Sequence, residues 1–157
     1  MFANLFVALF IVVGAASPDA WSPFNPFIGT WSGTRVTSAG KTPVTRDYEA
    51  IGGNQQLLVT DRVASERSPW GVVSFDGARN GFVLRRTAPD GSVSDLALTL
   101  VTDDGGTLVF EAASDGAAPA RRITDVRHGW NEFVERVETG SAGAYTLESE
   151  TTFRRRR

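Results

Sequence analysis

Ten short runs of alternating apolar and polar residues follow one another after residue 26, and no long helical pattern interrupts them. Alternation with a period of two places apolar side chains on one face of a strand, so each run predicts a half-buried β-strand. Without crossover helices such a chain cannot build a parallel sheet. The predicted strands are Phe27–Thr37, Val44–Ile51, Gln55–Ser65, Trp70–Asp76, Gly81–Thr87, Val93–Val101, Thr107–Ala113, Arg121–Arg127, Trp130–Glu138 and Tyr145–Arg154.

Residues that favour tight turns separate these runs. Asp-Gly steps begin at Asp76, Asp90, Asp104 and Asp115, and Gly tolerates the positive φ that tight hairpins require. Strands joined by hairpins form an antiparallel meander. An open sheet of this size would leave two edges able to pair with other chains, and closure removes both. The sequence therefore predicts an all-β fold, a single antiparallel up-and-down β-barrel of about ten strands, with a two-sheet sandwich as the structural alternative.

The start of the chain predicts a secretory leader. Leu5–Ala16 is an apolar run of about a dozen residues, the length of a signal-peptide core and too short to cross a bilayer. Gly14 and Ala16 supply the small residues at positions −3 and −1 of a cleavage site after Ala16. We therefore expect export to a bacterial periplasm or secretion, with a signal peptide at 1–16, a linker or N-terminal strap at 17–26 and the barrel domain at 27–157. An uncleaved membrane-anchoring helix is the alternative.

The composition restricts the partners of the protein. The formal net charge is −2 and is spread along the chain, so no basic face and no nucleic-acid partner are expected. The chain has no Cys, so its stability depends on packing and on backbone hydrogen bonds. One His without Cys cannot form a zinc or iron site of the usual ligand type. We expect no metal, and no membrane span after cleavage because no later segment is long and apolar enough.

A Gly-x-Trp sequence opens the first predicted strand, and basic residues end the last one. Gly29 lets the backbone bend where a barrel closes, and the indole of Trp31 fills that end. The first and last strands of a closed barrel are neighbours. Arg154 or Arg155 can therefore stack over the indole. We expect this contact to close one end of the barrel.

This pattern resembles the calycin superfamily, which includes lipocalins and fatty-acid-binding proteins. Their first strand carries Gly-x-Trp and their last strand carries a basic partner. Three stretches carry the resemblance: "FIGTWSG" at 27–33, "GVVSFDGARNGFVLRR" at 71–86 and "ESETTFRRR" at 148–156. The arrangement is similar to a group of uncharacterised bacterial lipocalin-like domains, and the similarity spans nearly all of the predicted mature chain. It implies a barrel that binds a small, mostly apolar ligand.

The Gly29-x-Trp31-x-Gly33 sequence is also similar to the start of the nitrobindin haem-binding barrels. That pattern continues with a further Gly, where this chain has Arg35. The haem-ligating His of that family lies in the last strand, and the last predicted strand here has none. The only His, His128, lies in the preceding predicted hairpin. Haem binding is therefore the least favoured alternative, and no cofactor is expected.

Strand alternation selects the residues expected to line the interior. Charged residues share faces with apolar ones, as Arg121 and Asp125 do with Ile123, and a water-containing cavity accepts this better than a dry core. In each adjacent arginine pair, 85–86 and 121–122, one side chain should point inward. It can then bind a ligand carboxylate or form an ion pair with Asp125 or Glu111. The predicted ligand-binding residues are Tyr48, Leu57, Phe75, Phe82, Arg86, Leu98, Phe110, Arg122, Phe133 and Tyr145.

The favoured function is reversible binding of a small hydrophobic molecule inside the barrel, without catalysis. A calycin-like isomerase or hydrolase acting on a hydrophobic substrate is the first alternative, and it requires His128 within reach of Glu132 or Asp125. No catalytic residue is assigned, because His128 lies in a turn sequence, where exposure is usual, and no Gly-x-Ser-x-Gly nucleophile motif occurs. The other alternative is a filled barrel that acts as a structural or interaction module, with no cavity larger than a few waters.

Overall fold

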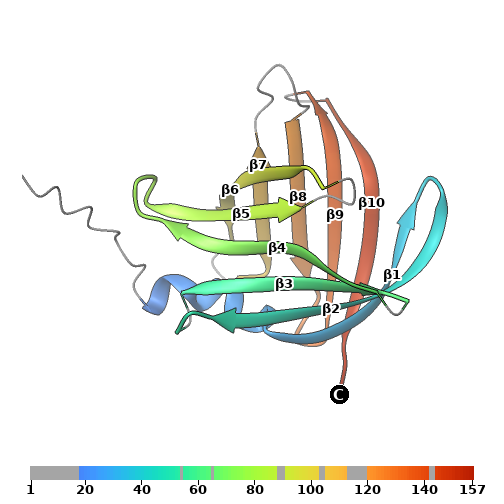
Figure 1. Ribbon diagram of the computed structural model, residues 1–157, viewed down its shortest axis with the longest axis horizontal. Helices are drawn as coiled ribbons and strands as arrows, with labels where there is room; N and C mark the ends of the chain where they lie inside the picture. The colour runs from blue at the N-terminus through green and yellow to red at the C-terminus, as the bar shows by residue number, and fades with distance from the viewer. Residues whose placement is uncertain are drawn as a thin grey trace, which may run out of the picture.

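The computed structural model describes residues 18–53, 55–64, 66–87, 91–102, 105–112, 120–141 and 144–157. In this part of the chain a short 3-10 helix precedes ten antiparallel strands that close into a barrel (Figure 1). The leader predicted at 1–16 lies outside the described residues. The elements are η1 (Pro18–Phe27), β1 (Gly29–Thr37), β2 (Gly40–Ile51), β3 (Gln56–Val63), β4 (Glu66–Asp76), β5 (Gly81–Thr87), β6 (Val93–Val101), β7 (Thr107–Ala112), β8 (Ala120–Arg127), β9 (Glu132–Ser141) and β10 (Ala144–Arg155).

The predicted up-and-down barrel is confirmed, and each of the ten predicted runs forms a strand. Each strand pairs with its neighbours in sequence, and β1 pairs with β10. At this seam Trp31 lies opposite Arg155 and Gly33 lies opposite Phe153. The sheet therefore has no free edge among the described strands, and the sandwich alternative is wrong. The strands β2 and β4 each begin four residues before the predicted runs, at Gly40 and Glu66.

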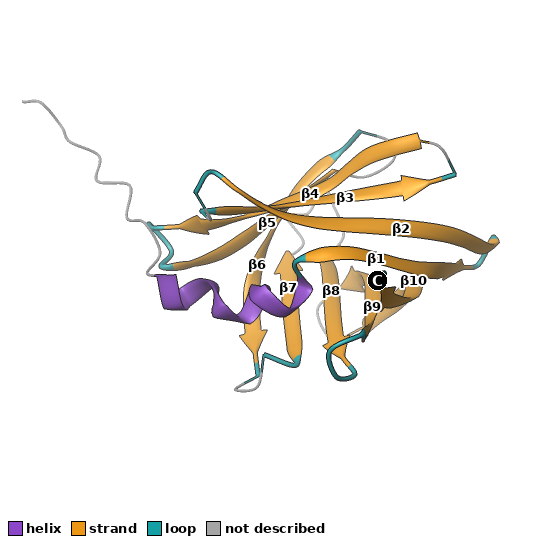
Figure 2. Cartoon of the chain, turned by 90° about the horizontal axis from the view of Figure 1, so that it is seen from below, coloured by secondary structure: helices purple, strands orange, loops and turns teal. Residues whose placement is uncertain are grey.

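The helix η1 covers one end of the barrel (Figure 2). Phe24 and Phe27 are buried in the core, and Trp21 packs edge-on against Phe82 of β5 with 4.7 Å between ring centroids. The segment expected as a linker or strap thus supplies aromatic side chains to the interior. We call this end the closed end. We call the opposite end of the barrel the distal end; the strands β1, β3, β5, β7 and β9 end there.

Three register shifts of the β-bulge kind interrupt the alternation of the described strands. They lie between β3 and β4 after Val59, between β6 and β7 after Leu98, and between β9 and β10 after Leu147. An extra residue reverses the face of every residue beyond it. Strict alternation along β6 would place Leu100 on the face of Leu98, whereas beyond the bulge Leu100 is 49% exposed.

Candidate functional site

Trp31 and Arg155 join the two ends of the chain at the closed end of the barrel. The fully buried indole donates its N–H to the Phe27 carbonyl at 2.7 Å, and the Arg155 Cζ lies 4.3 Å from the indole centroid. Arg155 also donates to the carbonyls of Ile28, at 2.9 Å, and Pro26, at 2.5 Å. One guanidinium therefore fixes η1, β1 and β10 together.

The contact expected between Trp31 and a terminal arginine is present, and Arg155 makes it. Arg154 alternates to the other face, where it pairs with Glu132 at 2.9 Å. Gly29 has a φ of +126°, and a Cβ built there would lie 2.9 Å from the Arg155 Nη1. Only a glycine combines that backbone conformation with the close approach of the guanidinium. This explains the glycine before the tryptophan in the sequence.

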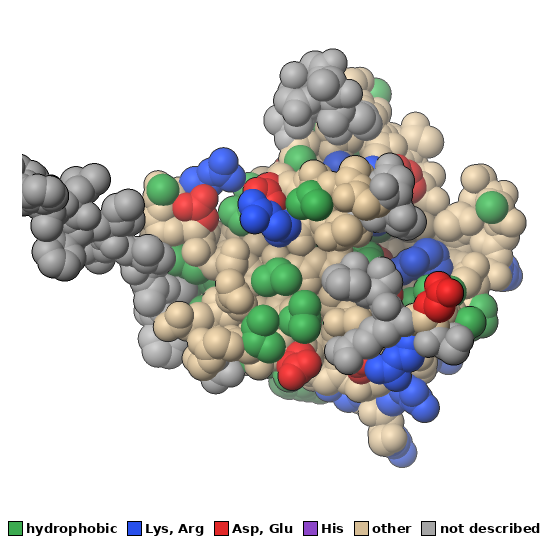
Figure 3. Space-filling view, in the orientation of Figure 1, with side chains coloured by type: hydrophobic (Ala, Val, Ile, Leu, Met, Phe, Trp, Pro, Cys, Tyr) green, Lys and Arg blue, Asp and Glu red, His purple; other side chains and the backbone are tan. Residues whose placement is uncertain are grey.

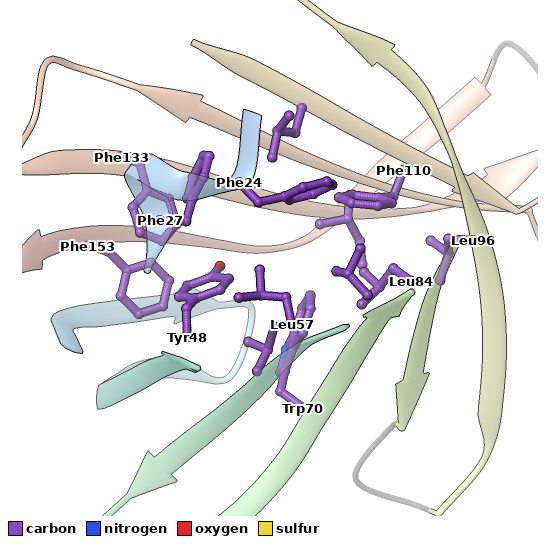
Figure 4. Packing of buried hydrophobic residues seen from close by; sticks show 14 of the residues in the cluster. Phe24, Phe27, Tyr48, Leu57, Trp70, Leu84, Leu96, Phe110, Phe133 and Phe153 are labelled. Carbon is purple, nitrogen blue, oxygen red and sulfur yellow. The ribbon is translucent and has the colours of Figure 1, made fainter. Parts of the chain in front are cut away.

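A small cavity lies in the apolar interior next to η1. Several of its lining side chains, among them Phe24, Leu57 and Trp70, are labelled in Figure 4. Among its described lining residues Asp125 carries the only carboxyl group, and Tyr48 contributes a hydroxyl. The space open to the centre of a water molecule is about 20 Å³, roughly that of one or two waters. This cavity by itself has no room for a drug-sized ligand. Besides Trp70, the apolar lining is formed by Phe24, Phe27, Leu57, Val59, Val73, Leu84, Leu108 and Phe110.

A buried network of charges lies beside this cavity. Arg46 of β2 is fully buried, and its Nε and Nη2 donate to both carboxylate oxygens of Asp61 at 2.6 and 3.0 Å. Its Nη1 donates to Glu135 of β9 and lies 3.4 Å from the Tyr48 hydroxyl. Arg35 of β1 donates to the same Asp61. Bidentate pairing of this kind offsets the desolvation of buried charges.

The charges in this network hold one another ionised. Burial alone would lower the pKa of Arg46, but attraction from Glu135, Tyr48 and Asp61 raises it well above its ordinary value. Burial alone would raise the pKa of Asp61, but Arg46 and then Arg35 lower it below its ordinary value. Arg46 and Asp61 are therefore a pair of ions rather than two neutralised groups.

Trp70 connects the cavity, the charge network and a further arginine. Between Pro69 and Gly71, the register with β3 skips Trp70, which is the extra residue of a bulge and is buried. Its ring lies 4.2 Å from the Arg46 Cζ and 5.2 Å from the Arg86 Cζ. Because Trp70 also lines the cavity, a movement of this side chain would join the cavity to the space around Arg86.

Arg86 is an interior cation with incomplete hydrogen bonding. It lies on β5 on the face of the buried Phe82 and Leu84. Its Nε and Nη1 are buried without a hydrogen-bond partner among the described residues. Burial and then repulsion from Arg121 lower the pKa of Arg86 below its ordinary value. A guanidinium that is desolvated, unpaired and close to a second cation favours an anion beside it.

Within the described chain, Arg86 does not form the internal ion pair that was the alternative to ligand binding. The ion pairs of the described residues include none between Arg86 and either Asp125 or Glu111. Arg121, the inward member of the second arginine pair, contacts Glu148 at 3.4 Å. The anionic partner of Arg86 is therefore not supplied by these side chains.

Asp125 is a buried carboxyl in the wall of the cavity. It is 6% exposed, its Oδ1 has no hydrogen-bond partner among the described residues, and it lies opposite Glu135 in the β8–β9 pair. Burial and then repulsion from Glu135 raise the pKa of Asp125 well above its ordinary value. Asp125 therefore keeps its proton to a higher pH than an exposed aspartate does, and in that form it can donate a hydrogen bond into the cavity.

Replacement of Asp125 by Asn should stabilise the protein at neutral pH by about 1–3 kcal/mol, because a buried, poorly satisfied acid is replaced by a neutral amide of the same shape. The raised pKa means that folded wild type holds a proton that the unfolded chain releases above about pH 3.9. Wild-type stability therefore falls as pH rises from there to the folded pKa, whereas the amide does not titrate. Denaturant unfolding at several pH values measures the difference, which should be small near pH 4 and grow with pH.

Asp95→Asn is the matched control, because its effect on stability should change with pH in the opposite direction. A hydrogen bond from Arg85 lowers the pKa of Asp95. Its carboxylate therefore adds a little stability above its unfolded pKa, and this is lost as pH falls. An Asp125→Asn gain that does not change with pH would contradict the assignment of a protonated Asp125.

The structure brings eight of the ten predicted ligand-binding residues to the interior face. Three of them, Tyr48, Leu57 and Phe110, line the cavity. Phe133 instead packs at the closed end, 4.9 Å from Trp31 between ring centroids. That these residues bind a ligand stays a prediction. The eight are Tyr48, Leu57, Phe75, Phe82, Arg86, Leu98, Phe110 and Phe133.

The expected inward placement of Arg122 and Tyr145 is wrong. Ile123 is buried, so Arg121 shares its face and Arg122 points outward, where it pairs with Glu138 at 2.8 Å. Tyr145 lies beyond the bulge of β10, which reverses its face. Its ring lies 4.2 Å from the Arg122 Cζ on that outer side.

His128 lies in the turn between β8 and β9 and is exposed, whereas Asp125 is buried in the interior. Its backbone N–H donates to the Glu132 carbonyl, as in an ordinary hairpin. The described geometry therefore does not unite His128 with the buried carboxyl. No group of three or more His, Cys, Asp or Glu side chains able to hold a metal occurs among the described residues.

Sequence reasoning missed the charge network. Arg46 alternates with Val44 and Tyr48, and Tyr48 was predicted to face inward. The same alternation therefore places Arg46 in the interior, and it does the same for Glu135 between Phe133 and Val137. Asp61 follows Val59 by two residues and Leu57 by four, so the same alternation also places Asp61 on the interior face.

The comparisons with known proteins support the fold. No family model matches the chain, and no curated protein matches its sequence. Among solved structures, Rv2717c from M. tuberculosis superposes with a TM-score of 0.59 at 16% identity, covering 90% of this chain and 99% of that chain. A redesigned beta barrel gives a TM-score of 0.40 at 14% identity, covering 84% and 93%. The superposition on Rv2717c supports the overall barrel fold.

Proposed function

We propose that this barrel reversibly binds a small, mostly apolar molecule that carries one anionic group. One observation carries the proposal: the Nε and Nη1 of Arg86 are buried in the barrel and have no hydrogen-bond partner among the described residues. Buried guanidinium N–H groups without acceptors are unfavourable, and a ligand carboxylate would supply a charged acceptor to one of them.

The surroundings of Arg86 support an amphipathic ligand. Arg121 adds a second cation, and the contact of Arg121 with Glu148 is a long one of 3.4 Å. Below Arg86 the wall becomes apolar, with Leu84 and Leu96 both buried. An anionic group would therefore lie toward the distal end, and an apolar body toward Trp70 and the cavity.

The small size of this cavity limits how such a ligand can enter the barrel. The cavity of about 20 Å³ admits only one or two waters, so the apolar body needs the space that Trp70 occupies. Trp70 sits on a bulge between β3 and β4, and the residues of a bulge are not held by a regular ladder. We propose that binding displaces the Trp70 ring from Arg86.

Decanoate should bind the wild type more tightly than 1-decanol, which has the same chain without the charge. Arg86→Gln should weaken decanoate binding by roughly 10- to 100-fold, the loss of a charged hydrogen-bonded pair of about 1.5–3 kcal/mol. It should leave the affinity for decanol nearly unchanged. Titration calorimetry measures all four affinities.

Arg85→Gln is the matched control, because Arg85 is the adjacent arginine on the outer face, paired with Asp95 at 2.8 Å. Its decanoate affinity should equal that of the wild type. Equal losses in the Arg85 and Arg86 variants would show a general charge effect and contradict the proposed site.

The small cavity favours a second candidate, a filled barrel that acts as a structural or interaction module. This candidate predicts that neither decanoate nor decanol binds, and that protein isolated from its host carries no retained molecule. Native mass spectrometry of that protein tests the second point. A retained small molecule whose mass fits an organic acid would favour the binding function.

We also propose that the protein is exported as a lipocalin-like carrier. The apolar run Leu5–Ala16 and the small residues at −3 and −1 support cleavage after Ala16. In the described part of the chain no helix has the length and apolarity to cross a membrane. Fractionation of host cells and N-terminal sequencing of the isolated protein test the location and the cleavage site.

A further inference from the structure

Trp130 is the most exposed large hydrophobic side chain of the described residues, at 72%. It lies in the turn between β8 and β9, at the closed end. The turn is held in place, since the Trp130 carbonyl accepts from the Arg155 Nε at 3.3 Å and the Arg127 Cζ lies 5.3 Å from its ring. The turn therefore holds Trp130 in a position where most of its apolar ring surface is exposed to water.

A second exposed apolar residue lies close by. Ile28, between η1 and β1, is 38% exposed, and its carbonyl accepts from the Arg155 Nη1 at 2.9 Å. The same guanidinium therefore holds Ile28 and Trp130 on either side of it. We call the surface formed by Ile28, Trp130, Arg127 and Arg154 to Arg157 the Trp130 surface.

The Trp130 surface is strongly basic. It carries the guanidinium groups of Arg127 and of residues 154–157, and Lys and Arg side chains gather near the end of the chain in Figure 3. Glu132 is the acidic side chain that pairs there, with Arg154, while Asp47 beside β1 pairs with Arg62. Because the whole chain has a net charge of −2, this positive charge is segregated from the rest of the molecule.

We infer that the Trp130 surface docks the closed end of the barrel onto membranes that contain anionic lipid. Tryptophan prefers the headgroup level of a bilayer, where its ring is apolar and its N–H remains hydrated. Clustered arginines are attracted to anionic headgroups. A soluble polyanion would satisfy the arginines but offers no apolar layer to Trp130 and Ile28. The inference does not depend on the ligand proposed for the interior, and it leaves the distal end facing away from the membrane.

Quenching of Trp130 by brominated lipid tests the inference on the full chain as isolated from its host. Vesicles of phosphatidylglycerol and phosphatidylcholine with brominated acyl chains should quench part of the fluorescence, and phosphatidylcholine vesicles alone should not. Trp130→Phe should remove most of the quenching, since Trp31 and Trp70 are buried and Trp21 is partly buried against the core. Salt at about 1 M, where the Debye length is about 3 Å, should also reduce it. A retained leader would tether every variant equally, whereas quenching of Trp130 still reports which surface faces the bilayer.

The double variant Arg156→Gln and Arg157→Gln should weaken binding to the anionic vesicles by roughly 10- to 30-fold, as expected for two basic residues at such a surface. The matched control removes the same charge elsewhere, with Lys41→Gln and Arg85→Gln, two exposed basic residues toward the distal ends of β2 and β5. Its binding should be unchanged. The inference is overturned by equal losses in both double variants, by equal quenching on phosphatidylcholine alone, or by binding to heparin without any quenching on vesicles.

Discussion

Arg46→Leu is expected to lower the free energy of unfolding by roughly 3–5 kcal/mol, since it leaves two buried carboxylates without their cation. Asp61 loses its bidentate partner and Glu135 loses its only described donor. Arg35 still reaches Asp61, but nothing in the described network replaces Arg46 at Glu135. Urea unfolding followed by circular dichroism measures the loss, which should be smaller at acidic pH, where the carboxyls can take up protons.

Two further variants separate a buried-charge effect from a loss of packing. Arg85→Leu removes an arginine from an exposed pair with Asp95 and should change stability by less than about 1 kcal/mol. The triple change Arg46→Met, Asp61→Leu and Glu135→Leu should recover much of the stability, because an apolar replacement of a whole ion cluster is often neutral or better. A triple variant as unstable as Arg46→Leu would show that these side chains stabilise the fold through their packing rather than through charge pairing.

Trp70→Ala is expected to cost roughly 3–5 kcal/mol in unfolding free energy, the usual loss for a large buried aromatic. It should also open a space continuous with the cavity and with Arg86, because the Trp70 ring lines the first and lies against the second. Apolar cavities of this kind stay dry and take up small apolar molecules. Decanoate should therefore bind this variant more tightly than the wild type.

Trp130→Ala is the control for the loss of a tryptophan as such. Its side chain is exposed, so the unfolding free energy should change by no more than about 0.5 kcal/mol and decanoate binding should not change. If Trp70→Ala lost stability but gained no affinity for decanoate, Trp70 would be part of a filled core and not a barrier to the ligand.

The strands were predictable because two separate patterns in the sequence mark them. Apolar and polar residues alternate within each strand, and turn-forming residues separate one strand from the next. For β5 and β6 the predicted and observed bounds are identical, Gly81–Thr87 and Val93–Val101. The helix η1 was not predictable as a helix, since Pro23 and Pro26 within it suggest an irregular segment. Its role follows from tertiary contacts, because Phe24 and Phe27 find burial only against a closed barrel.

The residues that face the interior were predictable only along the parts of each strand where no bulge interrupts the alternation. A bulge has no reliable signal in one sequence, so the reversal that turns Tyr145 outward could not be foreseen. The inward position of Arg86 followed from Phe82 and Leu84 on the same strand. The full burial of Arg46 did not follow, because its stability depends on Asp61 and Glu135 from strands that only the closed fold brings together.

The seam between β1 and β10 has a kinetic consequence. The residues that meet there, such as Trp31 and Arg155, are about 120 positions apart in sequence, so the ring of strands closes only when almost the whole chain is available. Contacts of such long sequence separation slow folding, and a nascent chain still lacking β10 has two unpaired edges. The barrel cannot close until synthesis is nearly complete, so the export proposed above would act on a chain whose sheet is still open.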